Sequence, residues 1–125
     1  MPSPTTVLAI DDDPLMLKLL KAFLERCGFT TVLTAASGTD GLRMAALHPI
    51  DLALLDFELG DLNGAVVATG IRRVRPKALI ILVSAADVPE TVQRLVDAFV
   101  PKQDFSSRLL PVLTMLGAAA GCSLE

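Results

Sequence analysis

Short apolar runs alternate along the chain with stretches in which apolar residues recur every three or four positions. The short runs have the length of strands, and most are apolar at successive positions, which is typical of strands buried on both faces. These runs predict strands at 6–10, 30–35, 51–55, 78–83 and 98–101. The stretches between and after them predict helices at 14–27, 37–47, 64–74, 87–96 and 107–116.

Several residues mark where these elements begin and end. Asp13 followed by Pro14 has the pattern of an N-cap and a first helical residue, and Gly28 has that of a glycine just past a helix end. The last helix has to begin near Ser107, because Pro111 is tolerated only close to the first turn.

Strands covered on both faces that alternate with helices predict the α/β class, with a parallel sheet between two layers of helices. Five such units with right-handed crossovers match a flavodoxin-like (βα)5 doubly wound sheet in three layers, with the strand order 2-1-3-4-5. In sheets of this kind, ligands bind beyond the carboxyl ends of the strands. Functional residues are therefore expected at that edge.

The 125 residues fit one domain, and a hydrophobic content of 52% is sufficient for a core without metals or disulfides. We expect a single domain at 1–125, with its core at about 6–117. The segment 118–125 is expected to be a linker or tail, and the last two residues, 124–125, resemble a vector scar. Cys27 and Cys122 are far apart in the sequence and predict a core thiol and a tail thiol without a disulfide.

The formal net charge of −3 and the absence of Trp and Tyr argue against direct binding of nucleic acid by this domain. The basic residues at 72–77 are expected to form a solvated helix end. No run approaches the ~20 apolar residues of a membrane span, and the first residues lack the pattern of a secretion signal. We therefore expect a cytoplasmic protein that makes no contact with a membrane.

Polar residues follow the predicted strands at the edge where ligands are expected. They are Asp11, Asp12 and Asp13 after the first strand, Asp56 after the third, Ser84 after the fourth and Lys102 after the fifth. Because parallel strands end at the same edge of a sheet, these side chains are predicted to converge.

Carboxylates gathered at one point repel one another unless a cation joins them. Mg²⁺ prefers oxygen ligands and commonly serves phosphate chemistry, so Asp11, Asp12 and Asp56 predict a site for Mg²⁺ or Mn²⁺. The metal and Lys102 together would balance the three carboxylates. An aspartyl phosphate formed at Asp56 would then face two sources of positive charge, and the Ser84 hydroxyl is placed to donate to a phosphoryl oxygen.

Five short motifs occur in a fixed order along the chain. They are Val-Leu-Ala-Ile-Asp-Asp-Asp-Pro at 7–14, Asp-Leu-Ala-Leu-Leu-Asp at 51–56, Asp-Leu-Asn-Gly at 61–64, Val-Ser-Ala at 83–85 and Phe-Val-Pro-Lys at 99–102. In this order and spacing the chain resembles a response-regulator receiver domain of two-component signal transduction, over about 7–116.

The resemblance implies a signalling function. Asp56 would take a phosphoryl group from a histidine kinase or a histidine phosphotransfer protein, and the domain would then regulate an output domain or partner. It would not be an ordinary enzyme, since it would catalyse only its own phosphorylation and dephosphorylation. The resemblance also implies that Asp12 and Asp56 bind Mg²⁺ directly, Asp11 through water, and Glu58 through its backbone carbonyl.

The resemblance further implies that Ser84 and Phe99 form a switch pair, in which Ser84 moves toward the phosphate and Phe99 follows it inward. Phe99 stands where Tyr is commoner in the family, and Gly60 stands where Pro is usual. The segment between Ser84 and Phe99 is about one helical turn short. Because the fourth helix belongs to the family's output and dimerisation face, this shortening bears on whether the domain forms the usual homodimer.

Two alternatives stay open. Asp11-x-Asp13 after an apolar strand also resembles the haloacid-dehalogenase motif, in which Asp11 would be the nucleophile of a phosphohydrolase, although Leu15 stands where that family has Thr or Val. The second is a pseudo-receiver that no longer takes phosphate, but the acidic residues and Lys102 are all present. Whether the chain is a single-domain regulator or the receiver of a longer one also stays open.

Overall fold

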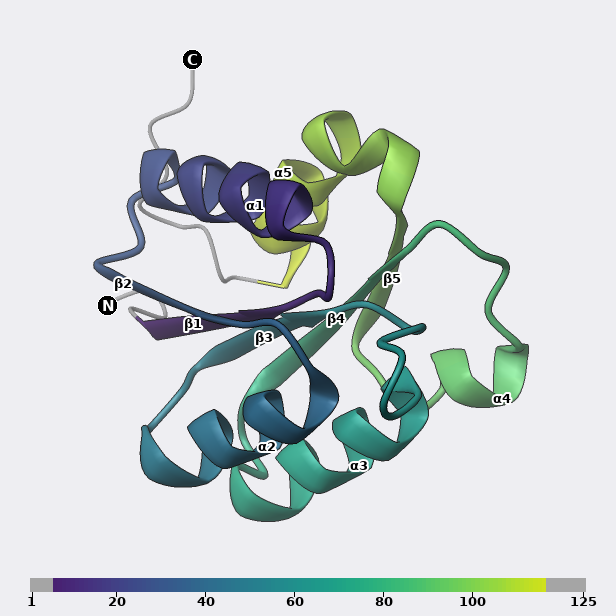
Figure 1. Ribbon diagram of the computed structural model, residues 1–125. Coiled ribbons are helices and arrows are strands. Elements are labelled where there is room, and N and C mark those ends of the chain that lie inside the picture. Colours follow the sequence, from purple (N-terminus) through teal and green to yellow (C-terminus); the bar gives the residue numbers. More distant parts are fainter. Residues whose placement is uncertain (1–5, 117–125) are drawn as a thin grey trace.

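The computed structural model describes residues 6–116, which form one sheet of five parallel strands covered by helices (Figure 1). The strands lie in the order β2-β1-β3-β4-β5, which confirms the predicted order. Their bounds are β1 Thr6–Ile10, β2 Thr31–Ala35, β3 Leu52–Leu55, β4 Leu79–Ser84 and β5 Ala98–Pro101. The expected tail at 118–125, with Cys122, lies outside the described residues.

Helices cover both faces of the sheet and give the three predicted layers (Figure 1). The helices of one face are α1 (Pro14–Arg26) and α5 (Phe105–Met115), and those of the other are α2 (Gly38–Leu47) and α3 (Gly64–Val74). The remaining helical segments are α4 (Glu90–Gln93), a single turn before β5, and η1 (Lys102–Asp104), a 3₁₀-helix that leads from β5 into α5.

Alternate residues of the central strands enter two separate cores. In β1, Val7 and Ala9 pack in the core under α1 and α5, whereas Leu8 and Ile10 pack in the core against α2 and α3. All four side chains are fully buried. The continuous apolar run in the sequence therefore reflects burial on both faces of the sheet.

The predicted helix boundaries are confirmed where a cap residue marks them. The Asp13 side chain caps α1 by accepting a hydrogen bond from the backbone N–H of Leu15 at 3.0 Å. Ser37 caps α2 through the backbone N–H of Asp40, also at 3.0 Å. Gly28, just past α1, has a φ of 96°, in the left-handed region that favours glycine.

The fourth helix is short, as the shortened segment between Ser84 and Phe99 predicts. It spans Glu90–Gln93 and is therefore shorter still than the expected 87–96. Pro89 disfavours helical backbone at the residue before it, so the helix begins only after this proline. At the other end, the Asp97 side chain accepts a hydrogen bond from the backbone N–H of Ile80 at 2.8 Å, which holds the chain against β4 before β5 begins. α4 itself buries none of its residues.

The last helix begins at Phe105, so Pro111 lies inside it, and the expectation of a start near Ser107 is wrong. Phe105 packs edge-on against Phe23 of α1, with ring centroids 5.9 Å apart, which favours the earlier start. Pro111 has no N–H to donate to the preceding turn. The burial of Leu109 on this helix contributes free energy that offsets part of the cost of the missing hydrogen bond.

The basic residues at 72–77 do more than form the solvated helix end that the sequence predicts. Arg72 donates to the carboxylate of Asp97 at 3.1 Å. Arg75 donates through Nε to the backbone carbonyl of Ala45 at the end of α2, at 2.9 Å. For these two arginines the expectation is corrected, because they fasten the C-terminal end of α3 to neighbouring segments.

Arg75→Ala is expected to lower the free energy of unfolding by about 1.5 kcal/mol, because the carbonyls at the end of α2 lose a charged donor. The guanidinium serves both Ala45 and Ala46, at 2.9 and 3.3 Å. Urea unfolding followed by circular dichroism measures the change. Arg73→Ala, at an exposed position in the last turn of α3, is the matched control and should change stability by less than about 0.5 kcal/mol. Equal losses in both variants would show that the two hydrogen bonds are not stabilising.

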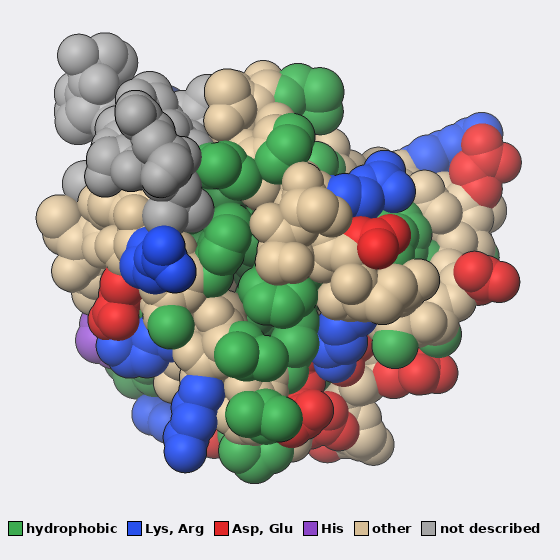
Figure 2. All heavy atoms as spheres, turned by 90° about the horizontal axis from the view of Figure 1, so that it is seen from above, with side chains coloured by type: hydrophobic (Ala, Val, Ile, Leu, Met, Phe, Trp, Pro, Cys, Tyr) green, Lys and Arg blue, Asp and Glu red, His purple; other side chains and the backbone are tan. Residues whose placement is uncertain are grey.

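The face that carries α1 and α5 also carries exposed hydrophobic side chains, which form a band in Figure 2. On α1, Leu15 is 64% exposed and Leu19 is 46% exposed. Leu15 is the second residue of α1, so it lies at the end of the helix that is closest to the carboxyl edge of the sheet. Exposed leucines grouped on one helix are available for contact with another molecule.

Two further expectations concern the described part of the chain. No helix within residues 6–116 is long and apolar enough to cross a membrane. Cys27, at the end of α1, is 3% exposed and packs in the core under α1 and α5, as predicted.

Candidate functional site

The ends of neighbouring strands bring polar side chains to one edge of the sheet. The register aligns Ile10 of β1 with Leu55 of β3, and Leu55 with Leu82 of β4. The residues that follow these positions are therefore neighbours. Among the described residues, the buried polar or charged ones are Asp11, Asp56 and Ser84. Such a concentration of buried polar groups is typical of a functional site.

Lys102, which follows β5, reaches both buried carboxylates. Its Nζ lies 2.8 Å from Oδ2 of Asp11 and 3.3 Å from Oδ2 of Asp56. Burial disfavours the charged form of Lys102, but the hydrogen bond and negative charge of Asp11, together with Asp56, outweigh it and raise the pKa of Lys102. Lys102 is therefore a cation at neutral pH.

The pKa of the Asp56 carboxyl group lies above its ordinary value and results from opposing influences. Burial raises its pKa, the charge of Lys102 lowers it, and the nearby charge of Asp11 adds to the rise. The backbone N–H of Glu58 donates to Oδ1 of Asp56 at 3.3 Å and also favours the ionised form. One ammonium thus faces two buried carboxylates, so negative charge is in excess in the pocket.

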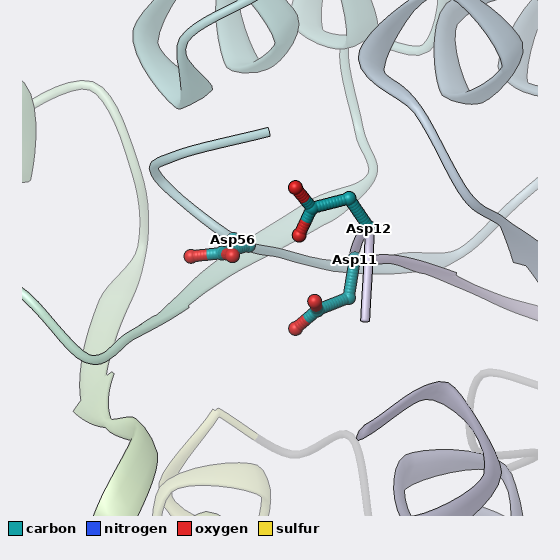
Figure 3. A group of neighbouring side chains, drawn as sticks. All are labelled: Asp11, Asp12 and Asp56. Atoms are coloured by element: carbon teal, nitrogen blue, oxygen red, sulfur yellow. The ribbon is translucent and has the colours of Figure 1, made fainter. Parts of the chain in front are cut away.

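Asp12 adds a third, exposed carboxylate to this pocket. Figure 3 shows Asp11 and Asp12 leaving the end of β1 on the side where Asp56 follows β3. One oxygen of each of the three residues lies within 4.8 Å of the others. An oxygen donor set of this kind fits a divalent cation such as Mg²⁺, which would also neutralise the excess negative charge. The residues present therefore fit the predicted metal.

Asp13 stays outside the cluster although it belongs to the same acidic run. Its carboxylate caps α1, and its backbone N–H donates to Oδ1 of Asp11 at 2.9 Å. The motif Asp11-x-Asp13 therefore places its second carboxylate on the helix and not in the pocket. This arrangement does not favour the alternative of a phosphohydrolase, in which both carboxylates would face the substrate.

The loop between β3 and α3 folds back beside the pocket in a conformation that depends on two glycines. Gly60 has a φ of 84°, in the left-handed region that a proline cannot adopt. A Cβ on Gly64 would lie 2.8 Å from the Cα of Phe57, which is too close for a side chain. Glu58 and Asn63 pair across the loop in an isolated antiparallel bridge. The loop therefore holds Glu58 next to the pocket.

Asp61, in the same loop, has a role that the sequence does not reveal. Its carboxylate accepts hydrogen bonds from the backbone N–H groups of Thr39 and Gly38 at the start of α2, each at 2.9 Å. These donors hold the pKa of Asp61 well below its usual range. The partners lie 22 and 23 residues away in the sequence, so no local spacing predicts the contact.

Ser84 and Phe99 lie on the neighbouring strands β4 and β5. Ser84 is buried at the carboxyl end of β4, and its Oγ accepts a hydrogen bond from the backbone N–H of Ala86 at 3.2 Å. The strand register pairs Ser84 with Pro101, two positions after Phe99. Phe99 is half-buried and packs against the core shared by α2 and α3. The hydroxyl and the aromatic ring are thus carried by adjacent strands.

Curated proteins with similar sequences include transcriptional regulatory proteins. Transcriptional regulatory protein KdpE of Mycobacterium tuberculosis is 37% identical over 123 residues, which cover 93% of this chain and 54% of KdpE. Transcriptional regulatory protein GlrR of Escherichia coli is 36% identical over 90 residues, which cover 71% of this chain and 20% of GlrR. The chain therefore spans about half the length of KdpE and a smaller part of GlrR.

Solved structures with a similar fold include a response regulator protein and a receiver domain protein. Response regulator protein TrrA of Thermotoga maritima, in complex with Mg²⁺-BeF, gives a TM-score of 0.82 at 29% identity, covering 90% of this chain and 98% of TrrA. A receiver domain protein of Methanospirillum hungatei gives a TM-score of 0.77 at 26% identity, covering 90% and 96%. The family model described as response regulator receiver domain matches residues 7–103. The chain therefore belongs to the response regulator receiver domain family of two-component systems.

Proposed function

We propose that Asp56 accepts a phosphoryl group from a histidine kinase or a histidine phosphotransfer protein. The observation that carries this proposal is a buried Asp56 carboxylate whose Oδ2 lies 3.3 Å from the Lys102 ammonium and whose neighbours are two further carboxylates. The complex of TrrA with Mg²⁺-BeF supports it, since TrrA is 29% identical to this chain.

In the transfer, a carboxylate oxygen of Asp56 forms a bond to phosphorus while the P–N bond to the partner's histidine breaks. The electron pair of the broken bond returns to the imidazole nitrogen. Lys102, a cation within reach of Asp56, opposes the negative charge on the phosphoryl oxygens. The buried Ser84 hydroxyl donates to one of these oxygens once the phosphoryl group is present.

Mg²⁺, or Mn²⁺ in its place, would supply the remaining positive charge at the phosphoryl oxygens. Asp12 and Asp56 would hold it through their carboxylates, Asp11 through water, and Glu58 through its backbone carbonyl. Among the described residues, no hydrogen bond engages the carbonyl oxygen of Glu58, so it is available as a ligand.

The acyl phosphate is then the signal, and Ser84 and Phe99 convert it into a change of surface. Ser84 moves toward the phosphoryl group, and Phe99 takes up the space that this movement opens on the adjacent strand.

The domain also ends its own signal, because water attacks phosphorus and Asp56 leaves as a carboxylate. Its catalysis is confined to these two reactions on its own side chain.

The partners follow from what lies around the pocket. The phosphodonor contacts the exposed leucines of α1, Leu15 and Leu19, since this helix begins directly after the acidic run that ends at Asp13. The output is an attached domain or a separate protein of the cytoplasm. The attached domain is supported by KdpE, of which the chain spans 54%. The single turn of α4 offers little surface for a homodimer of the usual kind.

Incubation with acetyl phosphate and Mg²⁺ tests the proposal directly. We expect intact-protein mass spectrometry to show the addition of one phosphoryl group, and EDTA to prevent it, because the carboxylates then lack the cation that offsets their charge. A chain that stays unmodified with Mg²⁺ present would contradict the proposal and favour a pseudo-receiver.

A further inference from the structure

The loop that carries Glu58 is fastened to another part of the fold by the side chain of Asp61. Oδ1 of Asp61 accepts from the backbone N–H of Gly38 at 2.9 Å. Oδ2 accepts from the backbone N–H of Thr39 at 2.9 Å and from its hydroxyl at 2.8 Å. Three hydrogen bonds to a charged acceptor make this a strong connection between the loop and the start of α2.

The loop and the helix are also in direct contact at this point. A Cβ on Gly38 would lie 3.0 Å from the Cβ of Leu62 and 3.2 Å from Oδ1 of Asp61. The pKa of Asp61 is held well below its usual range by the N–H groups of Thr39 and Gly38, so the carboxylate is ionised when these bonds form. The loop is therefore seated on α2 by packing as well as by hydrogen bonds.

The fastened loop reaches the metal-binding carboxylates on its other side. The backbone N–H of Glu58 donates to Asp56 at 3.3 Å, and Glu58 pairs with Asn63 across the loop. A Cβ on Gly60, one residue before Asp61, would lie 3.6 Å from Oδ2 of Asp12. A movement of Asp61 away from α2 would therefore shift the backbone that faces both carboxylates.

We infer that Asp61 is a positioning residue for the metal: its bonds to α2 keep the loop backbone at Glu58 where the cation needs a ligand. This inference rests on the proposed function. The alternative is that Asp61 only caps α2. That helix already has its own cap, Ser37, whose Oγ accepts from the backbone N–H of Asp40 at 3.0 Å. Ser37 is therefore a matched control, because its hydroxyl caps the same helix through a hydrogen bond that does not involve the loop.

The test compares Mg²⁺ binding by wild type, Asp61→Asn and Ser37→Ala, using isothermal titration calorimetry and the backbone amide shifts of Glu58. We expect Asp61→Asn to bind Mg²⁺ about tenfold more weakly, as is typical when a group that orients a metal ligand is lost. Ser37→Ala is expected to lose thermal stability but to keep the wild-type affinity for Mg²⁺. Acetyl phosphate labelling of Asp61→Asn should return to the wild-type rate at saturating Mg²⁺.

Thr39→Val provides a second variant, because it removes only the hydroxyl bond to Asp61 and keeps the shape of the side chain. Its Mg²⁺ affinity should fall between those of wild type and Asp61→Asn. Unchanged affinity in Asp61→Asn, or an equal loss in Ser37→Ala, would overturn the inference while leaving the proposed function standing. If the wild type binds no Mg²⁺, both the inference about Asp61 and the proposed function fail. The titration of the wild type therefore distinguishes this outcome from a failure of the inference alone.

Discussion

Asp56→Asn is expected to lower the rate of labelling by acetyl phosphate by at least about a hundredfold, to below detection in most assays. The amide that replaces the carboxylate carries no negative charge and is a poor nucleophile toward phosphorus. The variant keeps the shape of the side chain, and the ion pair of Lys102 with Asp11, 2.8 Å long in the wild type, does not depend on it. Reduction of the labelled wild type with borohydride converts a phosphorylated aspartate to homoserine, and peptide mass spectrometry should place it at position 56.

Asp13→Asn is the control that the structure offers for this experiment. Asp13 lies in the same acidic run, but its side chain caps α1 and takes no part in the cluster. Asn is as good an N-cap as Asp, so both stability and labelling should stay close to wild type. Equal labelling of wild type and Asp56→Asn would show that another residue accepts the phosphoryl group.

The alternative of a phosphohydrolase makes an opposite prediction about the same variants. If Asp11 were the nucleophile, hydrolysis of a phosphate ester would survive in Asp56→Asn and disappear in Asp11→Asn. The structure disfavours this outcome, because Asp11 is 1% exposed and its two oxygens already accept from Lys102 and from the backbone of Asp13. Both oxygens of Asp56 also accept hydrogen bonds, from Glu58 and Lys102, but at 3.3 Å each, compared with 2.9 and 2.8 Å for Asp11. The oxygens of Asp56 are therefore held less closely and are more available to attack phosphorus.

The sheet could be predicted from the sequence because each strand is specified by local signals. Val7 to Ile10 are apolar at every position, which is what burial on both faces requires. The ends of α4 and α5 could not be predicted, because they depend on distant contacts. Asp97 reaches back to the backbone of Ile80, and Phe105 packs against Phe23 of α1. Neither contact leaves a periodic pattern in the sequence.

The acidic cluster could be predicted for a similar reason. Asp11 and Asp56 directly follow strands, and the rule for parallel sheets places strand ends together. Asp61 could not be found in this way, since its partners belong to α2 and lie 22 and 23 residues away. The residues that give the site its chemistry are thus set by position along strands, whereas the residue that fastens its loop depends on tertiary packing.

Lys102→Met is expected to lower the free energy of unfolding in metal-free buffer by about 3 kcal/mol, the lower end for a broken buried ion pair. Methionine keeps most of the length but not the charge, so Asp11 and Asp56 would face each other without a cation. Asp11 is 1% exposed, and its Oδ2 would lose a partner at 2.8 Å. The smaller cost within the range for buried ion pairs applies because the Lys102 side chain is itself 19% exposed.

Mg²⁺ should recover much of this loss, because the cation supplies the positive charge that the variant lacks. Urea unfolding in EDTA and in saturating Mg²⁺ measures both effects. The double variant Asp11→Asn/Lys102→Met removes the stranded carboxylate and should be more stable than Lys102→Met alone. With the single variant Asp11→Asn and wild type it completes a double-mutant cycle that gives the coupling energy of the pair. If Lys102→Met in EDTA unfolds at the same urea concentration as wild type, the ion pairs do not stabilise the fold, and the contribution of Lys102 is limited to the phosphoryl group.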